Sequence, residues 1–254
     1  MKMLNKVPAV TLVFWIIKIM ATTVGETAAD FLAFNLRLGL ANTSLLMAGL
    51  LVLVLLAQLK ARRYVPALYW AVVVFVSIVG TLISDNLVDN LGVSLVTTTV
   101  IFSVALVLVF ALWYTSEKTL SVHTIQTTRR ELYYWAAILC TFALGTAAGD
   151  LIGEQFGLGY SLAALLFGGL IALTWLAYRL RGLNAVLAFW LAYILTRPLG
   201  ASLGDLLTQP AKAGGLDIST TIISSIFLVA IVVLVFFLTR RQQQEDAEAA
   251  SLPQ

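Results

Sequence analysis

Cysteine and histidine are almost absent from this chain of 254 residues. It contains one cysteine, Cys140, and one histidine, His123. A single cysteine excludes an internal disulfide, and because Cys140 lies in an apolar stretch it is interpreted as a small buried hydrophobe. His123 lies in a polar connector and is interpreted as solvated, so no apolar stretch carries a zincin motif or a Cys/His metal site.

Charge is also scarce. Only 11% of the residues are charged, 60% are hydrophobic, and the mean hydropathy is +0.95. This balance excludes an ordinary soluble domain, and the apolar residues lie in long blocks rather than at amphipathic intervals. The net charge of +3 sits on no separate basic domain, so the composition excludes a nucleic-acid partner and predicts an integral membrane protein in contact with the lipid bilayer.

The apolar blocks have the length of membrane-spanning helices. A spanning helix needs about 20 mostly apolar residues, and the unbroken run 222–238 is unlike the short alternating segments of a membrane β-barrel. Lys18 interrupts the first block, which is therefore interpreted as a retained span rather than a cleaved signal peptide. The prediction is all-α, with eight spans near 8–32, 43–59, 66–89, 94–114, 132–154, 161–178, 184–207 and 218–239.

One spaced signature occurs four times. It consists of an aromatic residue, a tryptophan, nine residues, a glycine, four residues and an aspartate. The four copies are Phe14, Trp15, Gly25, Asp30; Tyr69, Trp70, Gly80, Asp85; Tyr134, Trp135, Gly145, Asp150; and Phe189, Trp190, Gly200, Asp205. We therefore predict four helical-hairpin repeats in one transmembrane domain over 1–241, at about 8–60, 66–115, 131–180 and 184–241, followed by a disordered cytoplasmic tail over 242–254.

The spacing of the signatures and the basic residues predict the topology. Successive tryptophans are 55, 65 and 55 residues apart, which indicates two pseudo-symmetric halves of two repeats related by an axis along the membrane normal. Twelve basic residues fall on the side of the termini, whereas the opposite loops hold only Arg37 and Lys212. This bias predicts a multi-pass protein with both termini in the cytoplasm. It gives no oligomeric state.

The carboxylates inside the apolar stretches are the candidate functional residues. An aspartate of the signature lies about 22 Å deeper along its helix than the tryptophan, and ionisable groups at such depth are expensive and usually functional. The lead candidates are Asp30, Asp85, Asp150, Asp205 and Glu26. Further pathway candidates are Lys18, Thr22, Arg197, Asp89 and Glu154.

The charge balance at these positions favours a cation. Only two bases, Lys18 and Arg197, lie within the spans, so pairing leaves several acids without a partner. Hard oxygen ligands suit Mg, Ca, Mn, Na or protons, and an organic cation stays open. The structural alternative treats the acids as internal glue paired with the two bases, with Asp89 and Glu154 outside the membrane at helix ends.

The first repeat also resembles a known family. The stretch FWIIKIMATTVGETAADFLAF resembles the repeat of a family of uncharacterised bacterial integral membrane proteins. The later copies keep the tryptophan, glycine and aspartate but replace Lys18 and Glu26, for example by Val73 and Thr81. The resemblance implies a bacterial inner-membrane location and supplies no mechanism. The residues that carry it are Trp15, Lys18, Thr22, Thr23, Gly25, Glu26 and Asp30.

The predicted function is a cation transporter or channel of the inner membrane, with the repeat aspartates lining a central polar pathway and no cofactor beyond a bound hard cation. Two alternatives stay open. A non-catalytic sensor or scaffold would have a fully paired polar interior. An intramembrane enzyme of the aspartyl type needs a pair of acids, whereas four equivalent aspartates are present, so we expect no enzyme.

Overall fold

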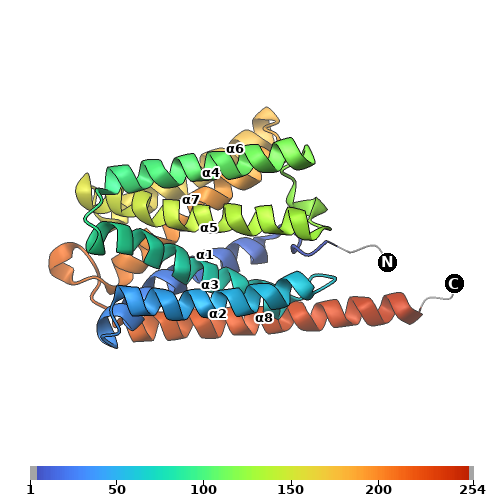
Figure 1. Ribbon diagram of the computed structural model, residues 1–254, viewed down its shortest axis with the longest axis horizontal. Coiled ribbons are helices and arrows are strands. Elements are labelled where there is room, and N and C mark those ends of the chain that lie inside the picture. Colours follow the sequence, from blue (N-terminus) through green and yellow to red (C-terminus); the bar gives the residue numbers. More distant parts are fainter. Residues whose placement is uncertain (1–4, 252–254) are drawn as a thin grey trace.

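The described part of the chain folds into a bundle of eight long helices (Figure 1). The computed structural model describes residues 5–251. All eight helices in this part of the chain are long and apolar enough to span a membrane, as predicted. Their bounds are α1 Leu12–Asp30, α2 Leu40–Lys60, α3 Pro66–Asp85, α4 Leu95–Glu117, α5 Thr128–Asp150, α6 Tyr160–Arg181, α7 Ala185–Thr208 and α8 Thr220–Ser251.

The signature aspartate marks a change of helix type in three of the four repeats. Directly after Asp30, Asp85 and Asp150 the α-helix gives way to one π-helical turn. In the fourth repeat α7 instead continues through Asp205 to Thr208. Single π turns inside helices are frequent at functional sites. The turns span Phe31–Asn35, Asn86–Asn90 and Leu151–Gln155.

The odd-numbered helices form the interior and the even-numbered helices form an outer wall. Over their most apolar windows, α1, α3, α5 and α7 have 56–67% of residues buried, against 11–22% for α2, α4, α6 and α8. The outer helices expose large apolar side chains such as Leu45, Val107 and Phe237, which suits contact with lipid. In Figure 1 the inner helices lie between α4 and α6 on one side and α2 and α8 on the other.

The four inner helices close into a ring in which α1 packs on α3, α3 on α5, α5 on α7 and α7 on α1. Each signature glycine lies at one of these contacts. A Cβ atom on Gly80 would lie 2.6 Å from the Cβ of Phe142, and one on Gly200 would lie 2.6 Å from the Cβ of Thr22. Since no larger residue fits at these contacts, the glycines set how closely neighbouring helices approach. Gly25 meets Ser77 and Gly145 meets Arg197 in the same way.

The outer helices follow the same cyclic order. The second helix of each repeat packs on the first helix of the next repeat, so that α2 covers α3, α4 covers α5 and α6 covers α7. The last helix, α8, returns to cover α1 and completes the circle. This order agrees with the predicted pairing of two similar halves. It also shows that each of the four repeats packs in the same way on the next one around a central axis.

The end of the chain differs from its prediction. The structure continues α8 as a helix through Ser251, where the polar and acidic composition predicts a disordered tail from residue 242. The segment is rich in glutamine, glutamate and alanine, which favour helix, and Arg241 pairs with Glu245 one turn later at 3.0 Å. Residues 252–254 of that prediction lie outside the described part. The start of the described chain and the end of α8 lie at the same end of the bundle (Figure 1).

Candidate functional site

Residues at intervals of four along each inner helix line the central axis. Counted from the signature glycine, the residues five and nine positions later line the same cavity in all four repeats, because side chains four apart share a helix face. The residue one position later lines it only in the first repeat, as Glu26. The position after the glycine holds Glu26, Thr81, Thr146 and Ala201. Five positions after it lie the four aspartates, and nine positions after it lie Phe34, Asp89, Glu154 and Gln209.

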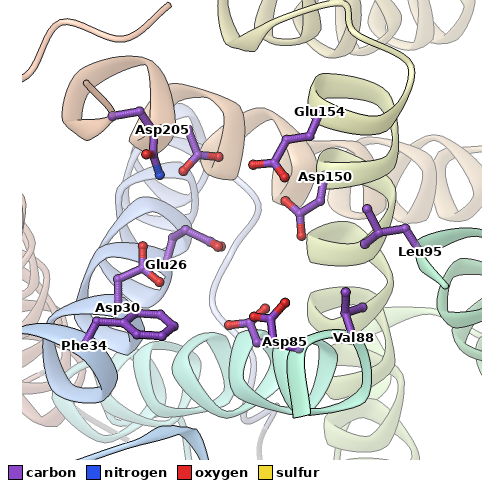
Figure 2. Close-up of a pocket in the computed structure, with 11 residues that line it drawn as sticks. Glu26, Asp30, Phe34, Asp85, Val88, Leu95, Asp150, Glu154 and Asp205 are labelled. Atoms are coloured by element: carbon purple, nitrogen blue, oxygen red, sulfur yellow. The ribbon is translucent and has the colours of Figure 1, made fainter. Parts of the chain in front are cut away.

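The carboxylates of these positions surround one cavity of about 160 Å³. Figure 2 shows the labelled acids arriving from all four inner helices around a common space. The cavity is also lined by Phe34, Val88, Leu95 and Gln209. Its seven acids are Glu26, Asp30, Asp85, Asp89, Asp150, Glu154 and Asp205. The structure thus brings together every acidic candidate that the sequence predicted.

The cavity has an exposed mouth and a buried floor. Asp89 and Glu154 are exposed, the four signature aspartates are half-buried, and Glu26 is 7% exposed. The two exposed acids lie in the π-helical turns that follow α3 and α5. Since these turns follow the ends of the odd helices, the mouth opens at the end of the bundle opposite the chain termini.

Arg197 closes the floor of the cavity. Its guanidinium, fully buried, donates to Glu26 Oε2 at 2.7 Å, to Thr146 Oγ1 at 2.7 Å and to the Thr22 backbone oxygen at 3.3 Å. It also donates to Thr81 Oγ1. These partners belong to α1, α3 and α5, so one side chain from α7 joins all four inner helices. Arg197 forms its ion pair with Glu26.

Lys18 lies beyond Arg197, one turn closer to the termini. It is fully buried, its ammonium contacts Thr22 Oγ1 at 3.4 Å, and it lies 4.5 Å from the ring centre of Phe142 and 4.3 Å from that of Tyr193. Within the described chain it forms no ion pair with a carboxylate. The expectation that Lys18 pairs with an acid is therefore wrong, because aromatic faces from α5 and α7 surround its ammonium.

Aromatic side chains seal the axis below Lys18. The signature aromatics meet at one level, where the Tyr69 and Tyr134 hydroxyls lie 2.5 Å apart and the rings of Phe14 and Phe189 lie 6.1 Å apart between centres. All four side chains are buried. The acidic cavity therefore has no continuation toward the termini in this conformation.

The carboxylates do not form a ready-made metal centre. In the part of the chain that the structure describes, no group of three or more His, Cys, Asp or Glu side chains is arranged to hold a metal ion. The assignment of Asp30, Asp85, Asp150, Asp205 and Glu26 to a hard metal ion stays a prediction.

Sequence reasoning missed two polar contacts. The first is the contact between Arg197 and Thr81. Thr81 occupies the same repeat position as Glu26, so an alignment of the four repeats would have indicated it as a candidate. The second is a buried ion pair near the chain start, in which Lys6 donates to Glu131 Oε2 at 2.6 Å and Gln58 donates to Glu131 Oε1 at 2.9 Å. No spacing in the sequence links these three residues.

Comparison with known proteins agrees with the repeat architecture. The family model described as Repeat of Unknown Function (DUF347) matches four consecutive segments, 13–64, 68–119, 133–182 and 188–244. The chain belongs to this family. The four DUF347 matches coincide with the four helical hairpins of the structure. No curated protein and no solved structure matches the chain.

Proposed function

We propose that this DUF347 protein is a transporter or channel for a cation and that its acidic cavity is the entrance of the pathway. The observation that carries the proposal is the excess of negative charge at one place. Seven carboxylates line the cavity, and of these seven only Glu26 forms an ion pair with a described residue. Carboxylates held so close repel one another unless protons or cations neutralise them.

The polar interior weighs against a purely structural role. A scaffold would use its buried acids as partners for buried bases, yet Lys18 and the four signature aspartates form no ion pair among the described residues. Four equivalent aspartates around an axis also fit a pathway better than a catalytic pair, which needs two carboxylates. The open mouth and the closed opposite end resemble one state of a carrier that alternates between two sides.

The basic residues give the direction of the proposed pathway. Positive residues gather in the loops on the side of the termini, which by the positive-inside tendency is the cytoplasm. We place the protein in the bacterial inner membrane, with the acidic mouth facing outward. In a Cys140→Ser background, a cysteine placed in the 61–65 loop should react with an impermeant thiol reagent only after cell disruption, and one placed beside Lys212 should react in intact cells.

A cation screen tests the function itself. Purified protein should gain thermal stability from its own cation, and proteoliposomes should accumulate that cation in proportion to the protein they contain. The matched control for substitutions of the cavity acids is Asp217→Asn, because Asp217 lies in a loop at the same end of the bundle as the cavity mouth but does not line the cavity. This variant should behave as wild type. If the protein neither binds nor moves any cation of the screen, the transport proposal fails and the scaffold role takes its place.

A further inference from the structure

At the floor of the cavity, acceptors from Glu26, Thr81, Thr146 and the Thr22 backbone form a binding site, here called the seat. It holds a cation that belongs to the chain itself, the guanidinium of Arg197. Glu26 lines the cavity and also accepts from Arg197, so the deepest carboxylate of the proposed pathway is already occupied. An arginine side chain keeps its charge under all ordinary conditions. A mobile cation that binds Glu26 Oε2 must therefore compete with Arg197.

The acceptors of the seat are spaced for N–H donors. They comprise one carboxylate, two threonine hydroxyls and one backbone oxygen, contributed by three helices. The contacts from Arg197 to Glu26, Thr146 and Thr22 are 2.7–3.3 Å long. Metal ions instead draw oxygen ligands to about 2.0–2.6 Å. The seat fits a guanidinium or an ammonium group, which satisfies several acceptors without contraction of the helices.

Arg197 also lies at a weak point of its helix. Pro198 follows it inside α7 and lacks the backbone N–H that would continue the helical hydrogen bonds. The Arg197 Nε atom has no hydrogen-bond partner among the described residues, although it is buried. Both features lower the cost of withdrawing this side chain from the seat compared with a fully bonded arginine in a regular helix.

We propose that Arg197 is a tethered stand-in for the transported ion, and that this ion is an organic cation of the guanidinium or primary ammonium class that displaces Arg197 from Glu26, Thr81 and Thr146. The proposal rests on the proposed transport function and adds its substrate class. It also assigns Arg197 a role in closing the pathway: while the guanidinium occupies the seat, the four inner helices are held together at this level.

Wild-type protein tests the substrate class directly. Binding of guanidinium, methylammonium, tetramethylammonium, Na⁺ and Mg²⁺ is measured on the full-length protein by calorimetry. Guanidinium or methylammonium should bind at least about tenfold more tightly than tetramethylammonium, which has equal charge but no N–H, and a tenfold ratio corresponds to about 1.4 kcal/mol. Equal affinity for tetramethylammonium, or binding of Na⁺ or Mg²⁺ alone, would overturn the proposal.

Removal of the tethered cation provides the second test. Arg197→Ala empties the seat, so millimolar guanidinium should raise the melting temperature of this variant. The double variant Glu26→Gln/Arg197→Ala should lose that response. Lys18→Ala is the matched control, because it also removes a buried base from the axis but one without a carboxylate partner. A guanidinium response equal in Lys18→Ala and Arg197→Ala would contradict the seat. If Arg197→Ala does not fold, the wild-type comparison alone decides.

Flux separates this inference from the proposed function. N–H cations that bind with the expected preference but are not moved across proteoliposomes would uphold the ligand class and end the transport proposal. Flux of Na⁺ or Mg²⁺ that guanidinium does not inhibit would uphold transport and end the role of Arg197 as a substrate stand-in.

Discussion

The acids of the cavity should differ sharply in what they contribute to stability. Glu26 is buried and bonded to Arg197, whereas Asp205 is half-buried and has no ion pair in the described residues. Glu26→Gln leaves the guanidinium buried with neutral acceptors only. Breaking a buried pair in this way costs about 3–5 kcal/mol. For a chain of this size 1 kcal/mol changes the melting temperature by about 2–4 °C, so the fall should be at least roughly 6 °C.

The same substitution at Asp205 should have the opposite effect. Asp205→Asn removes one negative charge from a cavity with seven acids, so the melting temperature should stay equal or rise. Thermal unfolding of wild type, Glu26→Gln, Asp205→Asn and the double variant Glu26→Gln/Arg197→Gln measures the contrast. The double variant should recover part of the loss, because it no longer buries a lone charge. An equal loss for Glu26→Gln and Asp205→Asn would refute the distinction between paired and unpaired acids.

Two further pairs of substitutions test the helix packing and the ion pairs. Gly80→Leu should prevent close approach of α3 and α5 and abolish folding. Gly49→Leu on the outer wall should leave membrane yield and melting temperature unchanged, because no neighbouring atom of the described chain lies within 4 Å of an added Cβ there. A stable Gly80→Leu protein would show that the ring of inner helices does not depend on this glycine. Lys6→Met should lower the melting temperature by an amount equivalent to about 3–5 kcal/mol, because it leaves the Glu131 carboxylate buried without its ion-pair partner. Arg241→Ala at the exposed pair should change stability by less than about 1 kcal/mol. Similar losses in the two variants would mean that burial does not determine how much these ion pairs stabilise the fold.

Much of the fold could be predicted from the sequence because the signature repeats without insertions. The spacing of its tryptophan, glycine and aspartate fixes which helix face turns inward, so the convergence of Asp30, Asp85, Asp150 and Asp205 on one cavity followed from the pattern. Apolar length gave the eight spans for the same reason.

Closure of the ring and the partners of the two bases could not be predicted. The sequence shows no mark of α8 packing on α1, since this contact joins the two ends of the repeat array. Lys18 and Glu26 lie on one helix two turns apart, but their partners come from other helices: Phe142 and Tyr193 for Lys18, and Arg197 for Glu26. Pairing across helices depends on how far each helix is rotated about its own axis and shifted along it, and a single sequence does not specify either quantity.

The central claim is that the signature aspartates form a cation pathway, and the most direct test is flux through the Asp85→Asn variant. Proteoliposomes with equal amounts of folded wild-type and variant protein are loaded with the cation that stabilises the wild type, and its movement down a gradient is followed. The account predicts flux in the wild type and its loss in Asp85→Asn at unchanged melting temperature. Undiminished flux per folded molecule, together with a lower melting temperature, would contradict it.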